Sequence, residues 1–403
     1  MKTIPFIQRT LKKGGKIGVL LLCYYLIELF FARQRDASQA ASIDLSAMVS
    51  IIYSFVCLYV GYGLCHKPRY SSLTNKIVFH SPLKWFFLYT IWGGITSIWS
   101  ISLPMTAFRS IECLGILFLM LAVVERLVVS KGENSTLEWV STFVFLSIII
   151  RFVIYITRGA EISIEVGDAG VFQCAQFIAP IFFYLPLYVT TPWLIKAIIY
   201  GMAVFSMSTT GYIGMALGAV STFWGNKKIR FFAIIGTLVL LGFMVTWGGE
   251  KILQNTIFIE KQEISIEQSS GRDQIWLAGL AWGGQKPLTG WGFSAGESAL
   301  LQQVGMTAVI GMHNTFLSAY VGSGIIGLFL IIMFWLSLLK SIMSRHIPKS
   351  IKPLFIALFM GAFIESIGNP GIGFRVYGTW LSASLVSVLI SVIYVKFKYE
   401  IAK

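Results

Sequence analysis

Long apolar segments recur along the whole chain, and they constrain its fold more than any other feature. A transmembrane helix needs roughly 20 mostly apolar residues, and about twelve segments approach or reach that length. Hydrophobic residues make up 56% of the 403 residues and charged residues only 12%, whereas about a quarter of an ordinary soluble protein is charged. We therefore predict an all-α polytopic membrane protein with a single integral membrane domain over residues 1–403. The expected spans have their central parts at residues 17–32, 47–65, 85–102, 110–128, 137–156, 171–189, 193–208, 211–225, 230–248, 314–339, 353–368 and 377–395.

The net charge of +14 is explained by the same membrane architecture. Lys and Arg are concentrated in short segments between apolar runs, as the positive-inside rule expects of cytoplasmic loops. Such segments surround Lys67, Lys131 and Lys196, and others include Lys227 and Lys340–Lys352. This distribution predicts that both the N-terminus and the C-terminus are cytoplasmic. It gives no reason to expect a nucleic-acid partner, because the bilayer topology already accounts for the basic residues.

One long interval between the ninth and tenth spans, residues 249–312, has no clean membrane span. On the predicted topology it is a large loop that faces the outside. Residues 272–282 (RDQIWLAGLAW) place apolar side chains where a helix lying on the membrane surface needs them. Pro287 and the glycines at 290 and 292 then interrupt that helix. We therefore predict an outward-facing loop with an interfacial helix near 272–282.

Ionisable residues inside apolar spans are costly and mark functional sites by default. The predicted topology places six of them in the outer halves or at the outer ends of their spans, and it leaves the inner halves nearly empty of charge except at their mouths. A transport pathway needs polar groups near the midplane, so this distribution favours a site at the outer face. The alternative is that arginines only reach the outer interface as snorkelling side chains, with a nearby glutamate neutralising one of them. The residues concerned are Glu28, Arg109, Glu112, Arg151, Glu365 and Arg375.

His313 is the one histidine that this topology places outside, because His66, His80 and His346 fall in cytoplasmic loops. A lone histidine makes no ordinary zinc site, and no DxD motif offers two carboxylates to a divalent cation. We therefore expect neither a metal nor a cofactor. Asn314 is a good N-cap for the tenth span, and a helix start there favours anion binding and a neutral His313 suited to general-base work. The alternative is that His313 caps the helix or hydrogen-bonds the loop.

Four short motifs follow one another along the chain. They are Ser102-Leu103-Pro104 with Arg109, then GRDQIW at 271–276, then PLTGWGF at 287–293, and finally HNTFL at 313–317 with the turn at 324–327. Their order, and the long loop before the tenth span, resemble the bacterial O-antigen ligase and polymerase family. These proteins are membrane glycosyltransferases that use polyprenyl-diphosphate-linked glycans.

The resemblance implies a GT-C-like fold in the bacterial inner membrane and metal-independent glycosyl transfer at its outer face. It implies that Arg272 binds the lipid diphosphate, that His313 activates the acceptor hydroxyl and that Glu365 supports them. The alternatives without a catalytic role are that Arg272 pairs with Asp273 or Glu267 at the surface, and that Glu365 is an ordinary residue at the outer membrane interface. Further candidates for contact with the diphosphate or the glycan are Arg109, Arg151, Arg375 and Asn314.

One departure from the family concerns residues 208–211 (STTG), where many members carry a Ser-Arg pair. The expected replacement for this phosphate-binding arginine is Arg109, Arg151 or Arg375, unless the contact is lost. The spacing of Arg272 and Gly283 resembles one found in outer loops of the polymerases. It slightly favours a polymerase that joins lipid-linked repeat units.

Two alternatives stay open. The first is a ligase that transfers the glycan to lipid A-core or protein. The more remote one is a transporter or flippase of about twelve spans, which predicts two similar halves and midplane charges that the sequence does not show. A flippase and a chain-length regulator are candidate partner proteins of a polymerase.

Overall fold

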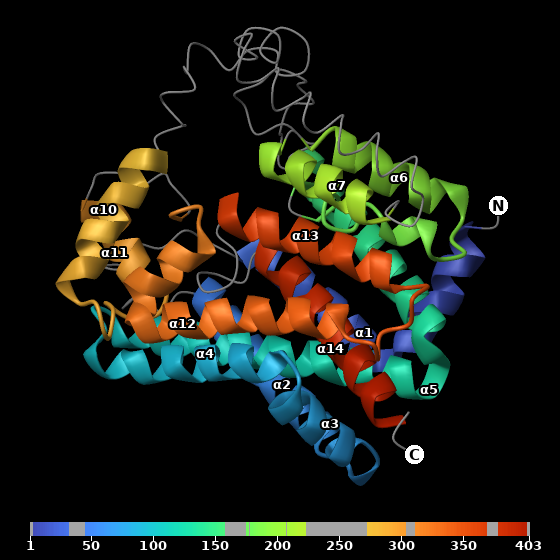
Figure 1. Ribbon diagram of the computed structural model, residues 1–403, viewed down its shortest axis with the longest axis horizontal. Helices are drawn as coiled ribbons and strands as arrows, with labels where there is room; N and C mark the ends of the chain where they lie inside the picture. Colours follow the sequence, from blue (N-terminus) through green and yellow to red (C-terminus); the bar gives the residue numbers. More distant parts are fainter. Residues whose placement is uncertain are drawn as a thin grey trace, which may run out of the picture.

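The structure is a computed structural model that describes residues 3–31, 45–157, 175–176, 178–206, 208–222, 272–303, 311–368 and 378–400. Over these ranges the chain forms α-helices, short 3-10 helices and turns, and no strand. The all-α fold class is therefore confirmed. The helices are α1 Thr3–Phe31, α2 Leu45–Cys65, α3 Pro68–His80, α4 Leu83–Ile95, α5 Leu103–Thr157, α6 Trp193–Val204, α7 Thr209–Thr222, α10 Arg272–Gln285, α11 Ala295–Gln303, α12 Thr315–Met343, α13 Lys352–Gly368 and α14 Gly378–Glu400 (Figure 1).

Among the described residues, four helices are long and apolar enough to cross a membrane, judged by length and composition. They are Ala47–Cys65, Leu103–Thr157, Thr315–Met343 and Trp380–Tyr399. The second of these, α5, has 55 residues and a break at Gly132 (φ 80°, ψ 173°). It contains both spans expected at 110–128 and 137–156. The polytopic character is therefore supported, whereas the number of spans stays a prediction because the expected span 230–248 lies outside the described residues.

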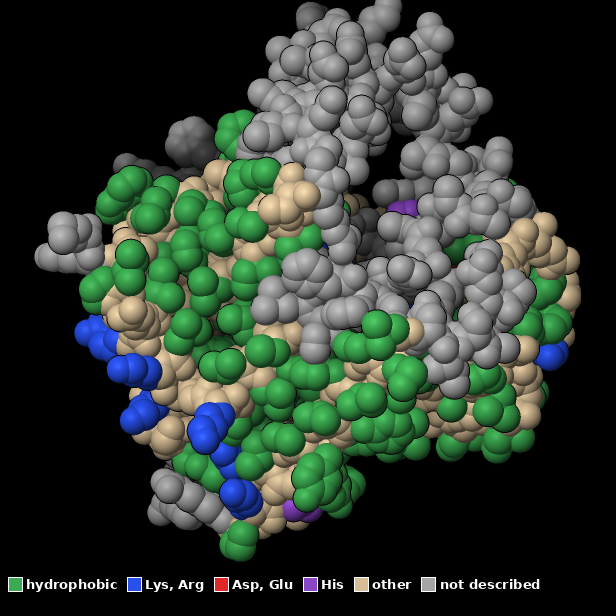
Figure 2. Space-filling view, turned by 180° about the vertical axis from the view of Figure 1, so that it is seen from behind, with side chains coloured by type: hydrophobic (Ala, Val, Ile, Leu, Met, Phe, Trp, Pro, Cys, Tyr) green, Lys and Arg blue, Asp and Glu red, His purple; other side chains and the backbone are tan. Residues whose placement is uncertain are grey.

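Apolar side chains on the outside of the helices are consistent with a lipid environment. On α2 the exposed residues recur every three or four positions, so they form one face of the helix. They are Met48, Ile52, Phe55, Tyr59 and Tyr62. Figure 2 shows apolar side chains over most of one face of the molecule, with Lys and Arg gathered toward one end. That end is the one where the chain termini lie in Figure 1.

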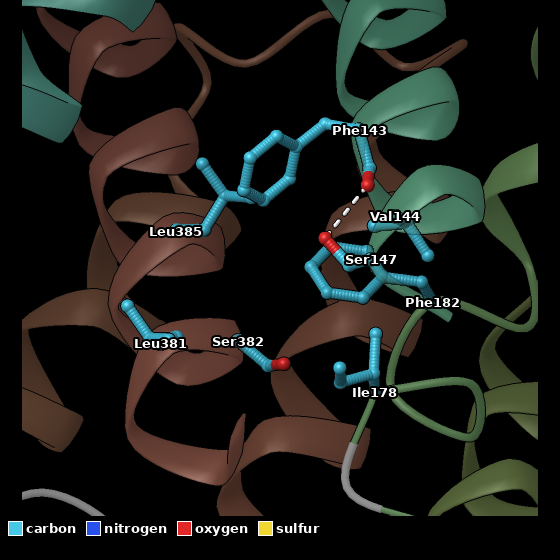
Figure 3. Close-up of a pocket in the computed structure, with 8 residues that line it drawn as sticks. All are labelled: Phe143, Val144, Ser147, Ile178, Phe182, Leu381, Ser382 and Leu385. Carbon is cyan, nitrogen blue, oxygen red and sulfur yellow. Dashed lines mark hydrogen bonds between the residues drawn. The ribbon is translucent and has the colours of Figure 1, made fainter. Parts of the chain in front are cut away.

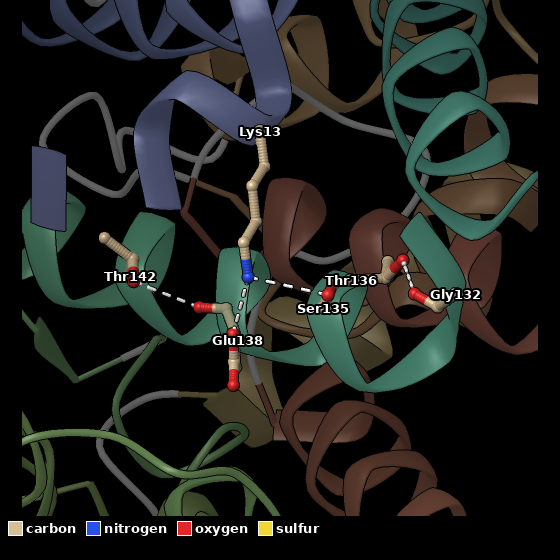
Figure 4. A network of polar contacts seen from close by, with 6 residues as sticks. All are labelled: Lys13, Gly132, Ser135, Thr136, Glu138 and Thr142. Atoms are coloured by element: carbon tan, nitrogen blue, oxygen red, sulfur yellow. Dashed lines mark hydrogen bonds and ion pairs between the residues drawn. The ribbon is translucent and has the colours of Figure 1, made fainter. Parts of the chain in front are cut away.

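Two ion pairs fasten the terminal helices to the same end of α5. Lys13 on α1 lies 2.7 Å from Glu138, and Lys396 on α14 lies 2.6 Å from Glu133. Both glutamates follow the break at Gly132, and Figure 4 shows Lys13 reaching across to this turn. The structure therefore places both terminal helices at one end of the bundle, as the topology predicted. Which side of the membrane this end faces stays a prediction.

The expected span at 171–189 does not form a continuous helix. The described residues 178–184 run as successive turns, and Leu185–Leu187 form a 3-10 helix. Pro180 and Pro186 cause the difference, because proline has no backbone N–H and clashes with the preceding helical turn. The segment is nevertheless buried in the protein, where irregular backbone is tolerated at membrane depth.

A small cavity lies between α5, this irregular segment and α14 (Figure 3). Its free volume is about 10 Å³, which is room for about one water molecule. The lining is apolar except for Ser147 and Ser382, and Ser147 Oγ donates to the carbonyl of Phe143 at 2.8 Å. This cavity is a packing gap and is far too small for a sugar.

Candidate active site

Three of the four sequence motifs meet at one end of the bundle. The segment 287–293 lies between the interrupted helix α12 and the start of α5. Gly292 N–H donates to the Gly322 carbonyl at 2.9 Å, and the Trp291 carbonyl accepts from Ile101 N–H at 3.1 Å. Positions far apart in the sequence are thus joined by main-chain hydrogen bonds, which hold the loop against two helices.

Glycines make this close approach sterically feasible. Gly324 breaks α12 with φ 67° and ψ −167°, and a Cβ there would lie 2.2 Å from the Leu288 carbonyl oxygen. Gly292 has φ 111°, and its Cβ would lie 2.0 Å from Ser100 Oγ. Only glycine adopts such backbone angles at low cost. The joint between α12 and the PLTGWGF segment therefore depends on these two residues.

His313 lies just before Asn314, the residue that precedes α12, and has a positive φ of 52°. A positive φ is uncommon outside glycine, and it persists where the surroundings fix the chain. Two side chains hold the residue before it. The Glu297 carboxylate accepts from Met312 N–H, and Trp276 Nε1 donates to the Met312 carbonyl at 2.8 Å. The backbone that carries the imidazole is therefore held in place by α10 and α11.

Asn314 is the N-cap of α12, as the sequence predicted. Its φ and ψ are −157° and 112°, and its Oδ1 accepts from Phe316 N–H at 3.0 Å and Leu317 N–H at 3.1 Å. This oxygen is engaged by the helix, so a role of Asn314 in substrate binding would have to use its amide nitrogen. The start of α12 places the positive end of its helix dipole beside His313.

Glu365 is fully buried in α13 and accepts hydrogen bonds from two hydroxyls of the α7 start. Ser208 Oγ lies 3.0 Å from one carboxylate oxygen, and Thr210 Oγ1 lies 3.1 Å from the other. Ser208 Oγ also accepts from Gly211 N–H at 3.0 Å and so caps α7. The STTG stretch, which lacks the arginine found in many family members, is therefore the hydrogen-bonding partner of Glu365.

Helices α12 and α13 bring His313 and Glu365 to the same end of the molecule. Phe316, in the first turn of α12, packs edge-on against Phe363 of α13 with 6.1 Å between the ring centroids. Figure 1 shows the two helices side by side, with α7 lying along α13. The structure thus places at the same end the two residues that the sequence singled out for catalysis, and their catalytic roles stay predictions.

The arginines differ in their surroundings. Arg109 Nη1 lies 2.6 Å from Glu112 on α5, and the same carboxylate accepts from the Tyr24 hydroxyl at 3.1 Å. The structure therefore pairs Arg109 with Glu112, and the substrate-binding role predicted for Arg109 stays a prediction. Arg151 is buried in α5, with 8% of its surface exposed.

Arg272 is the first residue of α10, and its side chain lies outside the described atoms. The same holds for the side chain of Glu28 in α1. Arg375 lies outside the described residues altogether, as do Glu267 and the segment 223–271. The roles predicted for Arg272 and Arg375 stay predictions. The helix expected near 272–282 is present as α10, whereas its position at the membrane surface is still a prediction.

A comparison with protein-family models finds the O-antigen ligase family over residues 194–332. This part of the chain, about a third of its length, is similar to the O-antigen ligase family. The family resemblance that the motifs suggested is thereby confirmed. Comparison with curated proteins gave no match.

The O-antigen ligase domain implies a glycosyltransferase-type enzyme that acts in a membrane on polyprenyl-linked glycans. The matched range includes Ser208, Arg272, His313 and Asn314. The remaining candidate residues, Arg109, Arg151, Glu365 and Arg375, lie outside it. The partners of Glu365 are inside the domain, however, so its carboxylate reaches the domain through Ser208 and Thr210.

Sequence reasoning missed three contributors to the site. Ser208 and Thr210 were noted only for the arginine that is absent there, although hydroxyls are natural partners of a buried carboxylate. Glu297 was not singled out, because it lies in the long loop and its bond to Met312 joins distant positions. The local sequence signals at Glu297 are an acidic residue in an otherwise apolar and glycine-rich stretch and a match to the capping-box pattern, and neither points to Met312.

Proposed function

We propose that the chain is a polymerase-type glycosyltransferase. It joins polyprenyl-diphosphate-linked oligosaccharide repeat units of a cell-surface polysaccharide, such as O-antigen, capsule or exopolysaccharide. The observation that carries the proposal is the convergence of His313, the start of α12 and the Glu365 cluster at one end of an O-antigen ligase domain.

The chemistry requires a base, a site for the diphosphate and little else. His313 takes the proton of the acceptor hydroxyl, while the hydroxyl oxygen forms a bond to the anomeric carbon of the donor sugar. The bond between that carbon and the diphosphate oxygen breaks, and polyprenyl diphosphate leaves. A glycosyl diphosphate already carries a good leaving group, so positioning and cationic stabilisation by Arg272 and the α12 dipole suffice without a metal.

The placement of charge supports a reaction at the outer face of the inner membrane. Lys and Arg gather toward the end where the chain termini lie (Figures 1 and 2), and basic ends face the cytoplasm under the positive-inside rule. α12 begins at Thr315, two residues after His313, and runs toward this basic end, where Lys340 lies in its last turn and His346 packs against Tyr394 of α14. His313 then faces the outside, where lipid-linked repeat units arrive after flipping.

An O-antigen ligase is the second candidate, because the matching family model is the one for O-antigen ligases. Its reaction has the same donor and the same base, but the acceptor is lipid A-core or protein. The spacing of Arg272 and Gly283 favours the polymerase. A flippase and a chain-length regulator are the partners that a polymerase would work beside.

The test is a transfer assay with the purified full-length protein in lipid, polyprenyl-diphosphate oligosaccharide and a metal chelator. The polymerase predicts a ladder of lengthening lipid-linked glycans with no other acceptor, and loss of the ladder in Arg272→Ala. A product that forms only when lipid A-core is added would reassign the chain to the ligases. Activity that the chelator abolishes would refute the metal-independent mechanism.

A further inference from the structure

Glu297 is a buried carboxylate with no assigned role. Only 1% of its surface is exposed, and it lies in the first turn of α11. Burying a charged group is expensive unless hydrogen bonds compensate, so such residues are kept for a reason. One partner of its carboxylate is the N–H of Met312, which immediately precedes His313.

The local sequence offers Glu297 a different partner, which the structure does not use. Residues 294–297 (SAGE) match the capping-box pattern, in which the glutamate bonds back to the N–H of the serine. That arrangement needs an extended serine, but Ser294 has φ 63°. The carboxylate instead reaches across to Met312. Its geometry therefore serves the His313 backbone rather than the start of its own helix.

The peptide groups on both sides of His313 are fixed. Before it, Met312 is held at its N–H by Glu297 and at its carbonyl by Trp276 Nε1, 2.8 Å away. After it, Asn314 is locked by capping α12. A residue with φ 52° keeps that angle only while its neighbours are held. Releasing one anchor is therefore expected to let the backbone at His313 relax.

We infer that Glu297 is a positioning residue for His313. Its carboxylate holds the Gly311–Met312 peptide group, one residue before His313, so that the imidazole faces the acceptor hydroxyl at the start of α12. The effect is on the rate of proton transfer and not on binding of the lipid-linked donor. The inference rests on the proposed function of His313, and the experiment separates the two.

The variants distinguish the loss of the hydrogen-bond acceptor at position 297 from a change in side-chain volume. Glu297→Gln keeps an oxygen that accepts from Met312 N–H, whereas Glu297→Leu keeps the volume and removes the acceptor. Trp276→Phe removes the indole N–H that donates to the next peptide group, between Met312 and His313, and keeps an aromatic ring. If Glu297→Leu does not fold, the comparison of Glu297→Gln with Trp276→Phe still applies.

The experiment measures kcat and KM for polyprenyl-diphosphate oligosaccharide with the full-length protein in lipid. Misplacement by about 1 Å costs on the order of 100-fold in rate, so kcat of Glu297→Leu should fall about 10- to 100-fold with KM unchanged. Glu297→Gln should restore most of kcat, and Trp276→Phe should lower it. Wild-type kcat in folded Glu297→Leu, or in Trp276→Phe if the former does not fold, would overturn the inference. So would an equal loss in Glu297→Gln and Glu297→Leu.

A readout independent of activity is the NMR signal of His313 in protein labelled with nitrogen-15 at histidine. The signal is assigned by its loss in His313→Asn. It should shift in Glu297→Leu and Trp276→Phe and stay near the wild-type position in Glu297→Gln. If wild type transfers no glycan, the proposed function fails while this measurement still decides the positioning role. An unchanged His313 signal in the folded anchor-removing variants would refute that role.

Discussion

Replacing Gly324 with alanine should loosen the joint between α12 and the PLTGWGF segment. The backbone angles, φ 67° and ψ −167°, lie in a region that is essentially restricted to glycine. The new Cβ would lie 2.2 Å from the Leu288 carbonyl oxygen and 2.7 Å from Thr289 N. Both contacts are with backbone, which cannot rotate away as a side chain can.

The magnitude follows from two terms. A disallowed backbone conformation costs about 1–3 kcal/mol, and overpacking costs about 1–3 kcal/mol. Gly324→Ala should therefore lower the free energy of unfolding by about 2–6 kcal/mol. Gly284→Ala is the matched control, because Gly284 lies inside α10 and a Cβ added there would have no atom within 4 Å. That change should stabilise the protein by up to about 1 kcal/mol.

Both values can be measured by unfolding the protein in mixed micelles with increasing SDS, followed by circular dichroism. Transfer activity should fall with Gly324→Ala at temperatures where the variant is folded, because the joint aligns the loop that leads to His313. If Gly324→Ala and Gly284→Ala have the same stability as wild type, the tight joint at Gly324 does not exist.

Three further predictions concern single contacts. Asn314→Ala removes the cap of α12 and should cost about 1 kcal/mol in unfolding free energy, whereas Asn314→Asp, which keeps an acceptor, should cost less. Equal losses in the two would argue against capping. Ser208→Ala should destabilise by about 1.5–3 kcal/mol by depriving the buried Glu365 of a hydroxyl. It should cost less in a Glu365→Gln background, and additive effects in a double-mutant cycle would exclude the coupling. Glu133→Gln should cost no more than about 1 kcal/mol, because its pair with Lys396 is partly exposed. A loss of unfolding free energy that is larger and insensitive to salt would contradict the partly exposed position of this ion pair.

Local sequence signals predicted the parts of the site that depend on neighbouring residues. Asn314 before an apolar run predicted the start of α12, and the RDQIW stretch predicted α10. The apolar runs predicted most helices, since burial in a bilayer needs little beyond length and hydrophobicity. The interruption of the helix expected at 171–189 could also have been predicted from the sequence, because Pro180 and Pro186 both interrupt a helix.

Contacts between distant positions could not be predicted. Ser208 and Glu365 are far apart in the chain, and only the packing of α7 against α13 brings the hydroxyl to the carboxylate. Glu297 matched a local capping pattern, but the positive φ of Ser294 prevented it. These interactions depend on how helices meet, and a single sequence carries no direct signal of that.

The central claim is that glycosyl transfer occurs at the end of α12 that carries His313. It is tested most directly by comparing His313→Ala with His346→Ala in the transfer assay. His346 lies just beyond the opposite end of the same helix, so it controls for loss of a histidine. The account predicts that His313→Ala loses transfer while folded and that His346→Ala keeps the wild-type rate. Full activity in His313→Ala would contradict it.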